Sequence, residues 1–106
     1  MKIKAVAMVA GAALLSLGVV GSAVAADGAA LYQSKTCFAC HGADANTPIM
    51  PVYPKLGGQS ATYAYNQMKD IKSGARANGQ SMAMKGIVMG VSDEEMKAIA
   101  DWLASQ

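Results

Sequence analysis

Histidine and cysteine are scarce in this chain of 106 residues, which contains one histidine, His41, and two cysteines, Cys37 and Cys40. A structural zinc site takes about four ligands, mostly Cys and His, so these three residues are too few to form one. The sequence also has no run of basic residues. It therefore gives no support for a nucleic-acid-binding surface.

The formal net charge of +2 comes from the N-terminal segment. Lys2 and Lys4 precede an apolar run over 5–20, and Ala23-Val24-Ala25 fits a small-x-small cleavage site. We expect residues 1–25 to be a cleaved secretory signal peptide. The alternative is a retained membrane anchor. It is disfavoured because the run is rich in Ala and Gly and no basic cluster follows it. Without the leader, seven basic residues face seven acidic ones in the expected domain, 26–106.

The scarce residues stand together as Cys37-Phe38-Ala39-Cys40-His41. This C-x-x-C-H spacing is the attachment signature of a c-type haem, in which each thiol bonds one vinyl group and the imidazole reaches the iron. A disulfide is the alternative, because export permits one. A thioredoxin-like redox pair is disfavoured, since no β-rich segment precedes Cys37. The motif predicts one covalently bound haem.

Three helices and no strand are expected after the leader. The first runs over 27–34 with Asp27 as N-cap and an inward face of Ala30, Leu31 and Tyr32. The second covers 61–73, from Ser60 as N-cap to Gly74 as the stop, with an apolar stripe of Ala64, Gln67, Met68 and Ile71. The third follows a Ser92/Glu95 capping box and buries Met96, Ile99, Ala100 and Leu103.

Two irregular stretches separate these helices. Prolines 48, 51 and 54 exclude a regular helix over 42–58, and the residues from Gly74 to Val91 show no clean periodicity. The remaining domain of about 80 residues is small enough to need a cofactor for stability, so the apoprotein is expected to be largely unfolded.

Four segments carry a resemblance to a known family: C-x-A-C-H-G-A-D at 37–44, YPKLGGQ at 53–59, QMKDIKSG at 67–74 and the tail SDEEMKAIADWLASQ. The chain resembles the class I c-type cytochromes of the short bacterial kind. It is similar to one half of the di-haem c-four cytochromes and to the single-haem c-five-fifty-three type. The resemblance implies a small all-α fold around one haem, with the first and last helices crossing. Gly28 and Tyr32 match the small and the aromatic position of that crossing on the first helix, and Trp102 matches the partner position on the last helix.

A methionine sulfur faces the histidine across the iron in class I cytochromes, and six methionines follow the leader. Met68 and Met96 are expected in the core because they lie on helix stripes. Met50 is expected on the histidine side of the haem. In the family members that the chain resembles, the ligand lies eight residues before the Ser of the last capping box, which gives Met84. Met82 is the main alternative as the iron ligand, and Met89 ranks third.

The resemblance also implies a proline carbonyl as acceptor for the second ring N–H of His41, in keeping with the partner that a ligating histidine usually has. Pro51 fits best, and Pro48 stays possible because the loop is one residue longer than the closest pattern. Tyr53 and Tyr63 are candidates for hydrogen bonds to a haem propionate, with ordinary aromatic packing as the alternative.

Taken together, these features predict a soluble, monomeric electron carrier of the bacterial periplasm that is not an enzyme. It would meet a membrane-bound donor and an oxidase or reductase acceptor, with Lys55, Lys85 and Lys97 biasing docking. Two alternatives stay open. One is the haem subunit of a larger dehydrogenase. The other is a gas-binding, sensing or peroxidase-like haem protein with an open iron site.

Overall fold

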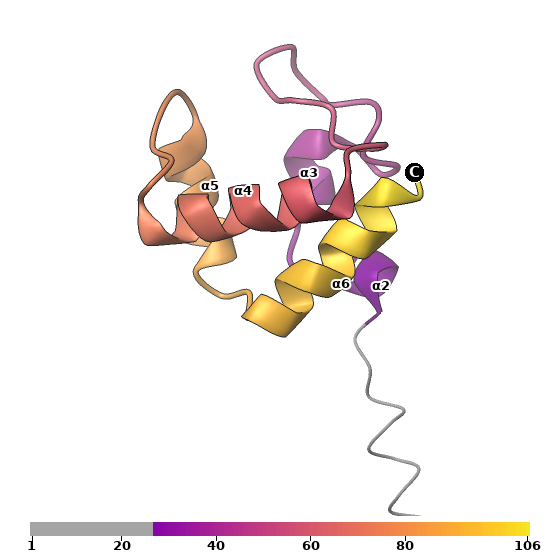
Figure 1. Ribbon diagram of the computed structural model, residues 1–106. Coiled ribbons are helices and arrows are strands. Elements are labelled where there is room, and N and C mark those ends of the chain that lie inside the picture. The colour runs from indigo at the N-terminus through magenta and orange to yellow at the C-terminus, as the bar shows by residue number, and fades with distance from the viewer. Residues whose placement is uncertain (1–26) are drawn as a thin grey trace, which may run out of the picture.

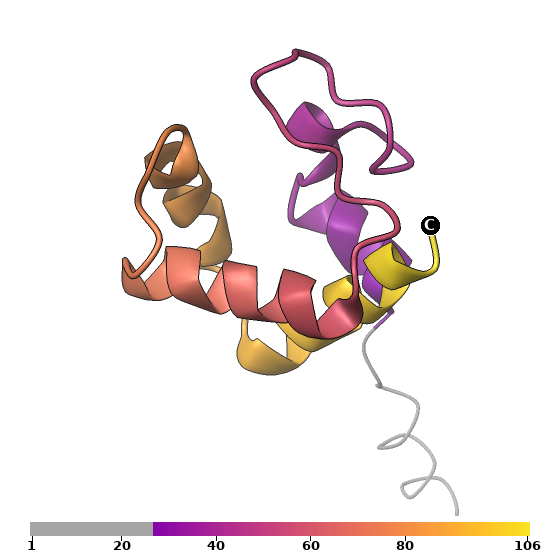
Figure 2. The same ribbon diagram turned by 45° about the horizontal axis from the view of Figure 1, so that its top comes forward.

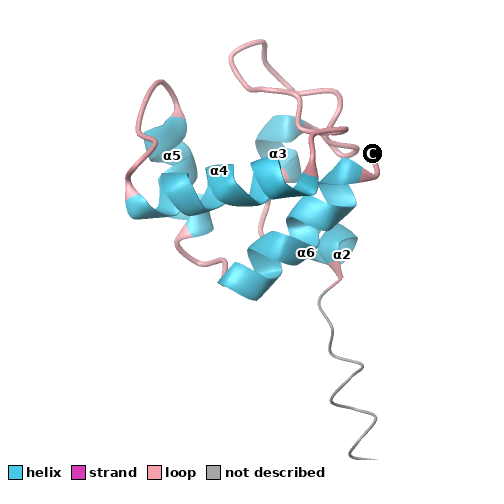
Figure 3. Ribbon diagram, in the orientation of Figure 1, coloured by secondary structure: helices cyan, strands magenta, loops and turns pink. Residues whose placement is uncertain are grey.

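The computed structural model describes residues 27–106, and the predicted signal peptide lies outside these described residues. The helices are α2 (Gly28–Ser34), α3 (Phe38–His41), α4 (Ala61–Ser73), α5 (Ser81–Val88) and α6 (Asp93–Ala104), arranged as in Figure 1. No strand occurs over residues 27–106 (Figure 3). The prediction of an all-α domain is confirmed.

The last helix, α6, begins at the predicted capping box. The Ser92 hydroxyl accepts the Glu95 backbone N–H at 3.1 Å, and the Glu95 carboxylate accepts the Ser92 N–H at 2.9 Å. These two bonds satisfy donors that the first turn of a helix leaves without partners. The predicted inner face is buried throughout: Met96, Ile99, Ala100 and Leu103.

Helix α2 crosses α6, and Asp27 caps it as predicted, accepting the Ala30 N–H at 3.2 Å. A Cβ on Gly28 would collide with the Ala98 carbonyl oxygen and with Cβ of Trp102, so the crossing depends on a residue without a side chain. The rings of Tyr32 and Trp102 lie 4.8 Å apart between centroids.

The predicted inner face of this first helix was only partly right. Tyr32 is fully buried and Leu31 half-buried, but Ala30 is exposed. A helix of seven residues that crosses its partner at one point buries only the residues near that point.

Helix α4 packs on both α5 and α6 and joins the two ends of the domain. Its predicted bounds are confirmed: the Ser60 hydroxyl accepts the Tyr63 N–H at 3.1 Å, and Gly74 is the C-cap. In Figure 2 it runs across the domain above α6, with α5 above one end and α3 and the loop over 42–60 above the other. Met68 and Ile71 are buried in the core that it shares with α6.

Helix α5 was not predicted. It has no side-chain N-cap and contains Gly86, so the usual sequence signals are weak. The signal that could have revealed its inner face is the helical spacing of Ser81, Met84 and Val88 at i, i+3 and i+7. Ser81 and Val88 are buried, and Met84 packs against the core.

The loop over 42–60 is irregular, as its prolines predict, but it is tied down at several points. The Ala45 carbonyl accepts the N–H groups of Leu56 and Gly57, both at 2.9 Å, and the Cys40 carbonyl accepts the Ile49 N–H at 3.1 Å. The Gly58 N–H donates to the Leu103 carbonyl of α6 at 3.0 Å. The loop is thereby fixed against both α3 and α6.

Candidate haem-binding site

The C-x-x-C-H residues occupy their own helical turn, α3. Thr36 has a φ of 62°, which turns the chain out of α2, and the Cys37 N–H donates to the Tyr32 carbonyl at 3.0 Å. Cys37 already has helical dihedral angles, so Cys37 and Cys40 stand at i and i+3 on one side of the turn. The motif thus presents both thiols in the same direction.

Cys37 and Cys40 are free and half-buried. Burial raises the pKa of the Cys37 thiol, and the hydrogen bond from its own backbone N–H partly opposes that rise. A thioether to haem forms when S–H adds across a vinyl double bond, which consumes no oxidant. The free thiols are the form that this addition requires, whereas a disulfide is not.

His41 is 6% exposed, and one side of its ring is fixed by the loop. Nδ1 lies 2.8 Å from the Pro54 carbonyl oxygen and donates its N–H to it. With the proton on Nδ1, the lone pair of Nε2 is available for iron. The ring is therefore held in the tautomer and orientation of an axial ligand.

This geometry corrects the prediction of Pro51 as the acceptor, and Pro48 does not take that place either. Pro51 and Pro54 both belong to the matched Pro-Val-Tyr-Pro segment, and the sequence match favoured the first of them. The loop turns at this point, with the Tyr53 N–H donating to the Met50 carbonyl at 3.0 Å. That turn leaves Pro51 exposed, and it is the Pro54 carbonyl that reaches His41.

The residue after His41 is fixed as well. Gly42 has a φ of 91°, and a Cβ there would collide with the Thr47 carbonyl. The Tyr32 hydroxyl donates to the Gly42 carbonyl at 2.5 Å. Burial raises the pKa of Tyr32 to about 12, and negative charge at Asp44 and, before haem attachment, at the Cys37 thiolate adds to the rise. Tyr32 therefore stays a hydrogen-bond donor across the neutral range.

The three candidate methionines differ in their surroundings. Met82 and Met89 are 61% and 55% exposed, whereas Met84 is half-buried and packs against the core. Two residues separate by about 200° around a helix, so Met82 and Met84 face opposite sides of α5. Met84 shares the inner stripe with Ser81 and Val88. Among the predicted core methionines, Met68 and Met96 are indeed buried.

The two tyrosines proposed as propionate donors lie in different environments. The Tyr53 ring is half-buried, 6.5 Å from the His41 ring between centroids, and lines a shallow depression with Pro48, Pro51 and Lys55. Tyr63 is 52% exposed on α4. The structure brings Tyr53 to the histidine side of the site and leaves Tyr63 outside the core.

The residues fit a covalently held haem better than a directly bound metal ion. Over residues 27–106, no group of three or more Cys, His, Asp or Glu side chains is placed to hold a metal ion. The site offers two thiols on one side of a turn and one imidazole nitrogen. Apart from Tyr63 on α4, the large apolar side chains that are exposed over residues 27–106 belong to α3, to the loop after it, or to α5 and the residue after it: Phe38, Ile49, Met50, Val52, Met82, Ile87 and Met89. Such a concentration of apolar surface suits contact with a large flat apolar ring.

Comparison with known proteins agrees with this arrangement. The sequence profile of the family described as cytochrome c matches residues 25–106. The chain is 46% identical over 95 residues to cytochrome c4 of Pseudomonas aeruginosa, covering 88% of this chain and 45% of that protein. It is 41% identical over 92 residues to cytochrome c-553 of Nitratidesulfovibrio vulgaris, covering 87% of each. The thiosulfate dehydrogenase electron acceptor of Stutzerimonas stutzeri is 40% identical over 98 residues, with 86% of this chain and 43% of that protein covered.

Among solved structures, reduced recombinant cytochrome c4 from Pseudomonas stutzeri is similar, with a TM-score of 0.60 and 31% identity. The similarity covers 65% of this chain and 37% of that one. An all-α domain with an attachment motif on a helical turn defines a c-type haem protein. The chain belongs to the cytochrome c family, has the class I fold and binds covalently attached haem c. It spans slightly under half the length of the cytochrome c4 relative and nearly the whole of the c-553 relative.

Proposed function

We propose that this chain is a mono-haem, one-electron carrier of the bacterial periplasm. Cys37 and Cys40 would hold the haem covalently, and His41 and Met84 would bind its iron. The observation that carries this proposal is the fixed His41 ring, and Met84 is supported as the half-buried one of the three candidate methionines. Family membership supports the electron-transfer role.

The haem supplies an iron that alternates between the ferrous and ferric states, and a neutral thioether ligand favours the ferrous one. The protein residues would supply the same two ligands in both states. The Pro54 carbonyl fixes the His41 ring by accepting from Nδ1. The Tyr32 hydroxyl fixes the next residue, Gly42, by donating to its carbonyl. With His41 and Met84 held in place in both states, little of the protein would rearrange when an electron moves.

Redox partners would dock through small, weakly held interfaces, which favour rapid turnover. Lys55 and Lys97 are exposed and Lys85 is half-exposed, so each can attract an acidic partner. The predicted leader supports export to the periplasm, and we propose a monomer without stable membrane insertion after cleavage. None of the helices over residues 27–106 is long and apolar enough to cross a membrane.

A potentiometric titration of the purified holoprotein tests the electron-carrier role. The proposal predicts a reversible one-electron transition between a low-spin ferric and a low-spin ferrous spectrum. A high-spin ferrous spectrum at the end of the titration would contradict it, because one axial position would then be open.

A second candidate is the haem subunit of a larger dehydrogenase. It is favoured by the similarity to a protein named thiosulfate dehydrogenase electron acceptor. Purification from the native periplasm at low ionic strength separates the two candidates. A dehydrogenase present at stoichiometric level would favour the subunit, whereas an isolated chain favours the free carrier.

A further inference from the structure

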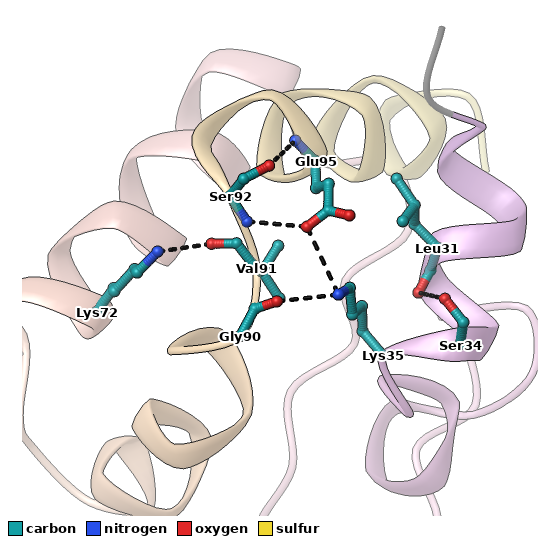
Figure 4. Close-up of polar contacts among 8 residues, drawn as sticks. All are labelled: Leu31, Ser34, Lys35, Lys72, Gly90, Val91, Ser92 and Glu95. Carbon is teal, nitrogen blue, oxygen red and sulfur yellow. Dashed lines mark hydrogen bonds and ion pairs between the residues drawn. The ribbon is translucent and has the colours of Figure 1, made fainter. Parts of the chain in front are cut away.

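The turn between α5 and α6 is held by two lysines from elsewhere in the chain (Figure 4). Lys35 Nζ donates to the Gly90 carbonyl at 2.9 Å, and Lys72 Nζ donates to the Val91 carbonyl at 2.7 Å. Hydrogen bonds with a charged donor are among the stronger ones in proteins. Two consecutive carbonyls of one short turn are thus bound by two separate ammonium groups.

The two lysines connect this turn to both halves of the domain. Lys35 is the C-cap of α2 and lies two residues before Cys37, whereas Lys72 belongs to the last turn of α4. Lys35 Nζ also lies 3.6 Å from the Glu95 carboxylate, which in turn accepts the Ser92 N–H. The end of α2, the turn and the start of α6 form one polar network (Figure 4).

Helix α5 depends on such external contacts for its position. It has eight residues, no side-chain cap at its N-terminus and a glycine at position 86. An isolated helix of this length is unstable in water. The connection before it, residues 74–80, is exposed apart from Arg76. Ser81 at its start and Val88 at its end are buried, and so is Val91 in the turn that follows.

We propose that Lys35 and Lys72 act as a clamp on the Gly90–Val91 turn that positions Met84 and slows its release from the iron. The inference rests on the proposed His41/Met84 ligation. By fixing two carbonyls beyond α5, the clamp keeps this helix in register with the segment that carries Cys37 and His41. Loss of either lysine leaves the turn after α5 bound by one ammonium group instead of two.

Lys69 provides a matched control. It pairs with Asp93, also in the first turn of α6, at 3.2 Å, but it has no hydrogen bond to the turn. Its side chain is 42% exposed and that of Lys35 is 28% exposed. Lys69→Ala therefore removes a lysine and an ion pair to α6 while leaving both clamped carbonyls in place.

The test measures how fast imidazole replaces methionine on the ferric holoprotein. At saturating imidazole the observed rate reports the opening of the methionine–iron bond. Lys35→Ala and Lys72→Ala are each expected to raise this rate about five- to thirtyfold, which corresponds to the loss of one or two kcal/mol. Lys69→Ala is expected to leave the rate within about twofold of wild type, because exposed ion pairs contribute little. Lys35→Arg keeps a charged donor and should restore a rate near that of wild type.

A general loss of stability would not reproduce this pattern, because all rates are measured well below each variant's thermal midpoint. If an Ala variant fails to fold, Lys35→Gln or Lys72→Gln keeps most of the stem and replaces the charged donor with a neutral one. Rates equal to that of Lys69→Ala in all clamp variants would overturn the proposal. If wild type itself lacks the near-infrared methionine–ferric band, the proposed ligation fails instead, so the two failures are distinguishable.

Discussion

Replacement of Gly28 by alanine should weaken the crossing of α2 and α6. The added Cβ meets a backbone carbonyl, that of Ala98, and the Cβ of Trp102, and neither is the free end of a flexible side chain. Overpacking of this kind costs about 1–3 kcal/mol. Alanine recovers up to about 1 kcal/mol through its higher helix propensity. From the middle of that cost range, about 2 kcal/mol, a net loss of about 1 kcal/mol is expected, which lowers the thermal midpoint by about 4–8 °C in a domain of this size.

Gly86→Ala is the matched control with the opposite sign. Gly86 lies inside α5, and a Cβ there meets nothing within 4 Å. Only the propensity gain of up to about 1 kcal/mol applies, so its unfolding free energy should rise. Denaturant unfolding of the ferric holoprotein, followed by helical circular dichroism, measures both variants. If Gly28→Ala is as stable as wild type, the crossing tolerates a side chain and the packing argument is wrong.

Three further predictions concern stability. Tyr32→Phe removes the hydrogen bond to Gly42, so about 1 kcal/mol of unfolding free energy should be lost at neutral pH. Because the pKa of Tyr32 is raised to about 12 in the folded state, the tyrosine ionises first in the unfolded state. The unfolding free energy of the wild type should therefore fall from pH 10 towards 12. Denaturant titrations of the Phe variant should lack this fall. The hydrogen bond from the Ser92 N–H lowers the pKa of Glu95, and Lys35 lowers it further, although burial opposes the shift. The Glu95 carboxylate therefore stabilises the folded state above pH 4.5, and this stabilisation is lost as the pH falls. In the same titrations, the stability of Glu95→Gln should depend less on pH in the acid range. The haem-free chain should give a largely unfolded circular dichroism spectrum, whereas a native-like helical spectrum would contradict a cofactor-dependent core.

Local sequence signals predicted the long helices well because their ends are encoded locally. Ser60 and Ser92 each satisfy a backbone donor within three residues, and the apolar stripe of α6 repeats with helical spacing. Such signals need no knowledge of the rest of the chain. The crossing of α2 and α6 was anticipated through the family resemblance, and Gly28 and Trp102 take the expected places.

The misses have a common physical cause, which is dependence on distant contacts. Helix α5 lacks a cap and contains a glycine, and its turn is held by Lys35 and Lys72 from other segments. The acceptor for His41 is chosen by how the loop turns, which the two prolines at 51 and 54 do not reveal locally. The C-x-x-C-H motif could be recognised from the sequence because its spacing alone is the signature of haem attachment.

The ligation of the iron by Met84 is the central claim, and carbon monoxide binding tests it most directly. Ferric and ferrous spectra would be recorded with and without carbon monoxide for wild type, Met84→Ala and Met82→Ala. Wild type and Met82→Ala should show the near-infrared methionine–ferric band and ignore carbon monoxide, while Met84→Ala should lose the band and bind the gas. Ready binding of carbon monoxide by wild type would instead indicate an open iron site and favour sensing or catalysis. Loss of the band in Met82→Ala alone would assign the ligand to Met82.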